Sequence, residues 1–469
     1  MSRWGSICSD SEVEGTLEVR VQGQTESARV LRAFLDRLEW TPEQLAREIN
    51  RLAGQEIVST KAPYYWLRGT VPRDRRAQLA AAAISRGIGE TISVGVLWPD
   101  RRGGSVALAA HHGLDLPWDA TGAVRCAELI AQPTGSTLLA ATGPMLVTCA
   151  VDWLTVPTAA PPTRTVGEPL THDAIDVLRE RIGQLRRLDD SQAGPMLLEW
   201  VVGDLRWAAA LATGTSYGRE GGAALFNVLA ELAQVAGWCA TDLDRFALGQ
   251  RFLLAALRFA HASHDRALAA NVLSCLSYQV LWTGDADSAI RIIRLARQSV
   301  DGHVNPLVGA LLASREGRAH AARGDREGCG YALEEAAACF AEYDAAAERA
   351  PAWAYWVSEG VLAADAGRAW LEIGDAHKAV ALLERGLDLL GADQPRNRVL
   401  HGLSLAQAHL ELNQFDAVAH FGHQALEVRP AIGSERVRDR MKKFRGALQQ
   451  RRTGETDLLA QRITDTLSA

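Results

Sequence analysis

The chain has 469 residues, of which 48% are hydrophobic, and a formal net charge of −6. That length predicts more than one domain with a sizeable core, and the composition argues against extensive disorder. Seven cysteines, an odd number without a C-x-x-C pair, exclude a disulfide scaffold or a zinc ribbon. No apolar segment follows the N-terminus, and proline and glycine interrupt the uncharged stretch 129–151. We therefore expect a cytoplasmic protein without a secretory signal or a membrane span.

The N-terminal third divides into three segments. Residues 1–25 are polar and lack periodicity, which predicts a flexible tail. Residues 26–103 have apolar residues at helical spacing and predict a small domain of short helices. Residues 104–171 are less regular and end in a stretch rich in threonine, alanine and proline, so we expect a linker there.

Two helix starts stand out in the small domain. Thr41, Pro42 and Gln44 predict a helix start, because Thr41 can cap, proline fits the first turn, and Gln44 completes a capping box. Ser59 is expected to begin the next helix, which Gly69 ends.

The segment 172–469 is predicted to be helical and repetitive. Turn pairs recur at 284–285, 324–325, 374–375 and 413–414, separated by 40, 50 and 39 residues. Small residues stand seven positions before and twelve after each turn: Ser277, Gly317, Gly367, Ala406, Ala296, Ala336, Gly386 and Ala425. Such residues let two antiparallel helices pack closely, and each pair must stack on its neighbours. We expect an all-α solenoid with C-terminal capping helices.

Three motifs carry a resemblance in the small domain: Gln44-Leu45-Ala46, Ser59-Thr60-Lys61, and the run from Trp66 to Arg73. In these motifs the region 28–100 resembles the lambda-repressor-like (XRE-type) helix-turn-helix domains. The segment 50–58 departs from the pattern, because it is several residues longer than the usual tight turn. The resemblance implies that this domain binds double-stranded DNA.

The Gly-Asp turns and the small packing positions of the region 172–430 resemble tetratricopeptide repeats. The whole layout is similar to bacterial, actinobacterial-type regulators with an XRE head and a tetratricopeptide body, including the RRNPP group. The resemblance implies the fold class, a small helix-turn-helix domain followed by a tetratricopeptide-like α-solenoid. It also implies a homodimer that senses a peptide or small-molecule effector.

Charge supports a DNA-binding head. Residues 26–103 hold thirteen basic and nine acidic residues, whereas the chain as a whole is acidic. The candidate DNA-binding residues lie at helix starts or in the basic run that follows: Gln44, Ser59, Thr60, Lys61, Tyr64, Arg68, Arg73, Arg75 and Arg76. The alternative is an interaction domain with a solvated basic edge.

The first helix of each pair lines the concave face of such a solenoid. The candidate effector-binding residues, counted back from the turns, are Asn271, Tyr278, Arg318, Arg368 and Gln407. Arg318 and Arg368 would attract a carboxylate. The alternative is that Arg368 pairs with Glu372, four residues further on.

No motif predicts catalysis, a metal site or a cofactor, so we expect a protein that is not an enzyme. The first hypothesis is a sequence-specific transcriptional regulator whose repeat domain senses a peptide, small molecule or protein partner and sets dimer geometry. The alternative is a tetratricopeptide interaction scaffold whose helix-turn-helix domain docks a protein rather than DNA.

Overall fold

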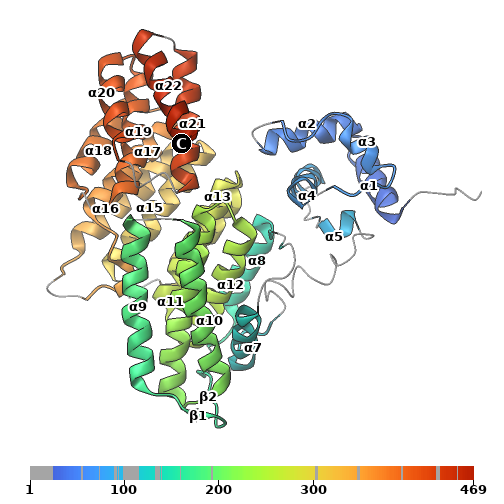
Figure 1. The fold of residues 1–469 in the computed structure, drawn as a ribbon, viewed down its shortest axis with the longest axis vertical. Coiled ribbons are helices and arrows are strands. Elements are labelled where there is room, and N and C mark those ends of the chain that lie inside the picture. Colours follow the sequence, from blue (N-terminus) through green and yellow to red (C-terminus); the bar gives the residue numbers. More distant parts are fainter. Residues whose placement is uncertain are drawn as a thin grey trace, which may run out of the picture. The chain divides into compact units, whose positions relative to one another are not determined.

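The computed structural model describes most of the chain after residue 24 (Figure 1). The described residues are 25–53, 56–72, 74–88, 92, 94–98, 116–132, 138, 140–158, 160–191, 194–300, 305–345, 349–391, 394–428, 434–451 and 453–468. They belong to two compact units, Met1–Ser105 and Val106–Ala469. The tail expected at 1–25 lies, apart from Thr25, outside the described residues, and so does Arg73.

Unit 1 is helical throughout its described part. Its helices are α1 (Glu26–Arg37), α2 (Pro42–Ala53), α3 (Ala62–Trp66), α4 (Asp74–Ile88) and α5 (Val94–Leu97). Each contributes apolar side chains to one small core, in which Leu31, Leu45 and Ile84 are fully buried. Trp66 meets Trp98 edge-on, with ring centroids 6.0 Å apart. This packing joins the end of α3 to the last turn of the unit.

The long segment between α2 and α3 is held by one side chain. The Asn50 amide donates to the Val58 carbonyl at 2.8 Å and accepts from the backbone N–H groups of Ile57 and Val58, both at 2.9 Å. These bonds replace the turn that a shorter connection would make. The helix then starts later than we predicted from Ser59, because Thr60 and Lys61 lie in a turn and α3 begins at Ala62.

Unit 2 is a stack of antiparallel helix pairs. The pairs are α11 (Arg219–Asp242) with α12 (Phe246–Ala262), α13 (Arg266–Trp282) with α14 (Ala286–Ser299), α15 (Pro306–Arg323) with α16 (Arg326–Glu342), α17 (Glu359–Ile373) with α18 (Ala376–Leu389), α19 (Pro395–Glu411) with α20 (Phe415–Leu426), and α21 (Glu435–Gln450) with α22 (Gly454–Ser468). The first helices of successive pairs contact one another and form the inner layer. The chain is therefore all-α, with helix pairs in the predicted segment.

Two further long helices, α9 (His172–Ser191) and α10 (Pro195–Gly214), precede the first pair and pack against α11. A short parallel pair of strands, β1 (Glu168–Pro169) and β2 (Thr215–Ser216), ties the segment before α9 to the end of α10. A single 3-10 turn, η1 (Ala352–Ala354), lies between α16 and α17.

The turns within the pairs follow from two residue types. Gly284, Gly324 and Gly374 have positive φ angles of 90°, 80° and 86°, a conformation that glycine adopts without steric cost. The aspartate after each glycine caps the next helix by accepting a backbone N–H bond, as Asp325 does from Gly328 at 3.0 Å. The Gly-Asp pairs seen in the sequence thus end one helix and begin the next.

Small residues allow the two helices of a pair to approach. A Cβ atom added at Gly367 would lie 2.7 Å from the Leu383 side chain and 3.0 Å from its backbone nitrogen. At the equivalent place in an earlier pair, the Ser277 hydroxyl donates to the Ala289 carbonyl at 2.8 Å. The position of Gly367 therefore leaves no room for a side chain, whereas the position of Ser277 holds a small one.

The segment 104–171, which we expected to be a linker, contains two helices of the unit 2 core. They are α7 (Ala120–Ala131) and α8 (Gly143–Thr155), which pack against α10 and α12 and against α13 and α14. Gln250 of α12 holds the chain before α8 by bonding both backbone groups of Ala141, at 2.6 and 3.2 Å. The linker prediction was wrong because the buried faces consist mainly of alanine and cysteine, which give weak hydrophobic periodicity.

One described helix, α11, is long and apolar enough to cross a membrane, but 67% of its most apolar window is buried inside the protein. It lies between α10 and α12. Its apolar composition is that of a core helix, which passes the same length and composition test.

We predict that Gly367→Ala lowers the thermal unfolding midpoint of unit 2, because the added methyl group collides with the backbone of α18. Overpacking of this kind costs about 1–3 kcal/mol. The matched control is Gly446→Ala in α21, where an added Cβ meets nothing within 4 Å. That change should raise stability by about 0.5–1 kcal/mol, since alanine favours a helix over glycine. Equal effects at the two positions would contradict the close-packing explanation.

Candidate functional site

A cavity of about 100 Å³ lies inside unit 2, between the helices of the inner layer. Side chains from α9, α11, α13, α15, α17, α19 and α21 line it, so residues from both ends of the unit meet there. Five arginines and three aspartates are among them: Arg186, Arg315, Arg368, Arg396, Arg436, Asp189, Asp190 and Asp365. A buried cavity with so many charged side chains is a candidate binding site.

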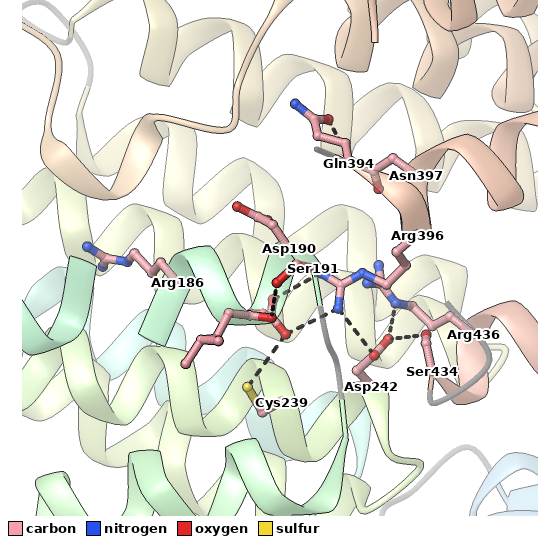
Figure 2. Close-up of polar contacts among 12 residues, drawn as sticks. Arg186, Asp190, Ser191, Cys239, Asp242, Gln394, Arg396, Asn397, Ser434 and Arg436 are labelled. Carbon is pink, nitrogen blue, oxygen red and sulfur yellow. Dashed lines mark hydrogen bonds and ion pairs between the residues drawn. The ribbon is translucent and has the colours of Figure 1, made fainter. Parts of the chain in front are cut away.

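Buried ion pairs close the helical stack around this cavity (Figure 2). Arg396, in the first turn of α19, makes two hydrogen bonds to Asp189 of α9, at 2.9 and 3.1 Å. The same guanidinium reaches Asp242, at the end of α11, at 3.5 Å. We name these three residues together with Arg436 the closure cluster. It joins α9 and α11 to helices that follow them by more than 150 residues in the sequence.

Asp242 is the acceptor at the centre of the closure cluster. Ser434 donates to its carboxylate at 2.9 Å, and Arg436 donates to the same oxygen (Figure 2). Burial by itself would raise the pKa of Asp242, but Arg436 and Arg396 outweigh burial and hold the pKa below its ordinary value. The carboxylate is therefore ionised at neutral pH and satisfied by three donors.

A second set of polar contacts lies beside this cluster. Arg186 pairs with Glu231 at 2.8 Å, and the Tyr355 hydroxyl donates to Asp190 at 2.7 Å. Cys239 donates weakly to Asp189 at 3.8 Å, and burial raises the pKa of this thiol, which keeps it protonated. These contacts join α9 to α11 and to the segment after η1.

Aromatic rings surround another arginine of the cavity lining. The Arg315 guanidinium lies 4.7 Å from the ring centre of Tyr278, 5.5 Å from that of Trp356 and 6.0 Å from that of Trp238. Its ion pair with Asp365 is loose, at 3.8 Å, and Arg368 is 3.5 Å from the same carboxylate. One aspartate therefore serves two arginines, neither of them at close hydrogen-bonding distance.

The excess of positive charge shows in the tyrosine that faces these arginines. Burial would raise the pKa of Tyr278, but Arg436, Arg368, Arg315 and Arg318 lower the pKa to about 8 by stabilising the phenolate. The cavity is therefore electrostatically suited to an anion.

Other lining groups keep unused hydrogen-bonding capacity. The described residues offer no hydrogen-bond partner to the buried Nη2 of Arg186, Nε of Arg315 or Nδ1 of His401. Burial, followed by Arg368, lowers the pKa of His401 to about 3, so its ring is neutral. Unsatisfied buried polar atoms are costly, and their clustering at one cavity is typical of a binding site.

The structure separates the predicted effector-binding residues into two groups. Asn271, Tyr278 and Arg368 line the cavity. Arg318 and Gln407 do not belong to its lining, and Arg318 lies 3.5 Å from Glu372. Arg318 is displaced because Arg315, almost one helical turn earlier, holds the lining position on α15. The pairing proposed as the alternative for Arg368 is also corrected: its acidic neighbour is Asp365, and Glu372 pairs with Arg318.

Sequence reasoning missed the residues that come from the ends of unit 2. Asp189, Asp242, Arg396 and Arg436 carry no local motif. A weak signal was available in α21, where arginines stand among the apolar positions of the helix. The Arg436 side chain there is only 10% exposed.

The candidate DNA-binding residues of unit 1 lie around α3. Ser59, Thr60, Lys61, Tyr64, Arg68 and Arg76 are exposed, while Arg73 and the side chain of Arg75 lie outside the described residues. Two candidates have structural roles. Gln44 accepts the backbone N–H of Thr41 at 2.6 Å and completes the predicted capping box, and Tyr64 donates to Glu43. An acidic side chain thus stands beside Tyr64, which disfavours an approaching phosphate.

No group of three or more His, Cys, Asp or Glu side chains that could hold a metal ion is found within the described ranges. Two of the histidines have other neighbours there. His423 contacts Arg462 at 2.8 Å, and the ring of His261 packs against Trp118.

Comparison with known proteins adds little to this geometry. The family model of the SP15 N-terminal domain matches residues 31–97, which belong to unit 1 and are a small part of the chain. No curated protein matches the chain. Among solved structures, the APC/C hetero-tetramer Cut9-Hcn1 is similar over 94% of this chain and 92% of that chain, at 14% identity and a TM-score of 0.30. A TM-score this low supports no argument, so the all-α fold rests on the helices of the chain itself.

We predict that Arg396→Met strongly destabilises unit 2, since it leaves the carboxylates of Asp189 and Asp242 buried without their shared partner. Breaking a buried ion pair costs about 3–5 kcal/mol, whereas an exposed pair contributes at most about 1 kcal/mol. The control is therefore Arg385→Met, whose pair with Glu359 is exposed. Thermal unfolding measures both.

This destabilisation should depend on pH in a defined direction. Because the folded pKa of Asp242 is depressed, its stabilising effect is present above the pKa of the unfolded state and disappears as pH falls through the folded pKa. The difference between wild type and Arg396→Met should shrink in that acidic range. A difference that stays constant would contradict the role of the carboxylates.

Proposed function

We propose that the protein is an interaction scaffold whose unit 2 binds a compact anionic ligand, or the acidic group of a partner, in its central cavity. The observation that carries the proposal is the positive potential there, which lowers the pKa of a buried tyrosine to about 8. Arg315 and Arg368 supply the cations. Asn271, also at the cavity, supplies a side-chain amide for orientation.

The size of the cavity restricts the ligand. A water molecule needs roughly 10–15 Å³ of such volume, so a cavity of about 100 Å³ accommodates several waters or one small charged group. A carboxylate, a phosphate or a short acidic terminus has this size. The proposal is therefore a compact acid or the end of a partner chain, rather than a peptide lying along several helices.

The position of the cavity suggests how binding would be transmitted. Arg396 and Arg436 belong both to the cavity lining and to the closure cluster. The closure cluster brings residues from both ends of unit 2 to this cavity, so the complete lining exists only in the closed arrangement. A ligand shifts a conformational equilibrium only by its difference in affinity for the two states, so one that uses the complete lining would favour the closed arrangement.

We propose a binding role rather than catalysis, in a reducing compartment such as the cytoplasm. The six cysteines of the described part are free thiols, namely Cys126, Cys149, Cys239, Cys275, Cys329 and Cys339. Burial raises the pKa of Cys126 to about 12, so this thiol is protonated and unreactive.

DNA binding by unit 1 is a second candidate function. It is favoured by the exposure of Lys61, Arg68 and Arg76 around one short helix. The bond between Tyr64 and Glu43 weighs against it, as does the five-residue length of α3. A protein-docking role for unit 1 fits the same exposed surface.

We predict that anion binding and ionisation of Tyr278 oppose each other. The absorbance of tyrosinate is measured against pH in wild type and in Tyr278→Phe. The difference between the two curves should show one tyrosine that titrates near pH 8. A bound anion neutralises the arginines and raises this pKa, so the affinity for the anion should fall as pH rises through 8. The probes are inorganic phosphate, a dicarboxylate and a short acidic peptide. Unchanged titration with all three would refute the proposal.

Arginine substitutions provide the independent check. Arg315→Gln or Arg368→Gln should weaken the binding of an active probe about tenfold to a hundredfold, since a charge-assisted hydrogen bond contributes about 1.5–3 kcal/mol. Arg385→Gln, on the exposed side of α18, serves as the control. Calorimetric titration of the full chain measures the affinity, and equal losses in all three variants would contradict a specific site.

For the second candidate function, DNA binding, we predict an effect of Lys61→Ala, Arg68→Ala and Arg76→Ala on salt dependence. Each should reduce the slope of log affinity against log salt concentration by about 1. Thr60→Ala should change sequence preference by about 1–3 kcal/mol instead. Arg385→Ala in unit 2 is the control. A gel-shift titration at two salt concentrations measures these effects. If the full chain retards no genomic fragment, unit 1 is a protein-docking domain.

A further inference from the structure

The outer face of α10 exposes an apolar stripe that unit 2 does not cover. Met196, Trp200 and Trp207 have 58%, 48% and 43% of their surface exposed. They recur at helical spacing, so they lie on one side of the helix. Tryptophan is usually well buried, and two exposed tryptophans on one helix face are typical of an interaction surface.

The other side of α10 packs against neighbouring helices. Its buried side faces α7 and α11, and α9 lies alongside it (Figure 1). Between α9 and α10 runs an open groove of about 480 Å³ whose lining includes Trp200, Gly203 and Leu188. Arg181 of α9 donates to Asp204 of α10 at 2.7 Å across this groove. The stripe is thus part of a rigid two-helix surface.

One acidic and one basic residue flank Gly203 on this face. Glu199 and Trp200 precede the glycine by four and three positions, and Arg206 and Trp207 follow it by three and four. A Cβ added at Gly203 meets nothing within 4 Å, so the centre of the face is open. In an antiparallel pair centred on Gly203, Trp200 lies opposite Arg206 and Glu199 lies opposite Trp207, so the acid of each copy is one residue from the base of the other.

We propose that α10 is a homodimer interface, in which two copies of the chain pair their α10 helices antiparallel about a two-fold axis near Gly203. The axis places Trp200 of one copy beside Arg206 and Trp207 of the second copy. It also places Glu199 within reach of the Arg206 guanidinium of the second copy. Seven residues separate the two tryptophans, about 10 Å along a helix, and the small Gly203 allows close approach between them.

Charge complementarity distinguishes a second copy from other occupants. In the antiparallel pair the acid of each copy lies near the base of the other, whereas an apolar peptide offers no partner for either charge. Arg206 also suits the face of the opposing Trp200 indole, where a cation is stabilised by about 0.5–2 kcal/mol. An isologous contact of this kind uses one surface twice and closes as a dimer.

Sedimentation of the full chain at micromolar concentration tests the interface. Wild type should have twice the 50.7 kDa mass of the chain. Trp200→Asp and Trp207→Asp should each give the monomer, while Tyr331→Asp, at a 72% exposed aromatic of α16, should leave the dimer intact. Circular dichroism verifies folding of each variant. A monomeric wild type, or a dimer that both α10 substitutions leave unchanged, overturns the proposal.

Two further variants test the antiparallel geometry itself. Glu199→Arg and Arg206→Glu should each weaken the dimer, and the double variant should restore it, because the exchanged charges again face each other. Gly203→Cys should form an intermolecular disulfide under mild oxidation, and Gly454→Cys, at an open position of α22, should not. If the double charge variant does not restore the dimer and Gly203→Cys forms no selective disulfide, the pairing about Gly203 is refuted. The same result is expected if unit 1 covers this face.

Discussion

The ion pairs of the closure cluster hold the two ends of unit 2 together. In a stack of helix pairs each pair contacts only its neighbours, so nothing local decides whether the stack stays open or closes. Asp189 and Asp242 stand at the ends of early helices, and Arg396 and Arg436 at the starts of late ones. Because these charges are buried, loss of one partner within the closed form would leave a carboxylate without its cation, which costs about 3–5 kcal/mol.

Closure determines the chemistry of the interior. The inner helices bring more arginines than aspartates into a space with little water, where charges interact more strongly than at the surface. Part of this charge is satisfied by the closure cluster itself. Against the effect of burial, Arg436 of this cluster, followed by Arg368 and Arg315, lowers the pKa of Tyr278, and Arg315 and Arg368 share one carboxylate. Arginine therefore stabilises the fold in the closure cluster and favours an anion in the cavity.

The interior and the outer face of α10 are connected through one helix. The C-terminal end of α9 carries Asp189 into the closure cluster, and its middle carries Arg181 to Asp204 of α10. Coupling between two sites requires an element whose equilibrium both of them bias. The helix α9 lies between the two sites, since it contacts α10, α11 and α19.

Much of the architecture follows from local sequence alone. The Gly-Asp turns predicted where the first helix of three pairs ends and the second begins, because glycine adopts the left-handed conformation freely and aspartate caps the following helix. Small residues at fixed offsets predicted which helices pair closely. The capping box of Thr41 and Gln44 is confirmed as well, since its bonds span only three residues. These features depend on neighbours in sequence or on a regular repeat.

Tertiary structure decided what local patterns do not encode. Counting back from the turns selected Asn271, Tyr278 and Arg368, which line the cavity. It also selected Arg318, although Arg315 holds the lining position on α15. The two positions are three residues apart and therefore lie close to the same face of the helix. The helices α7 and α8 were missed because alanine and cysteine give weak periodicity, although long-range contacts such as Gln250 with Ala141 fix them in the core. The pairing of Arg396 with Asp189 joins residues 207 apart, and only the closed stack of helices brings such partners together.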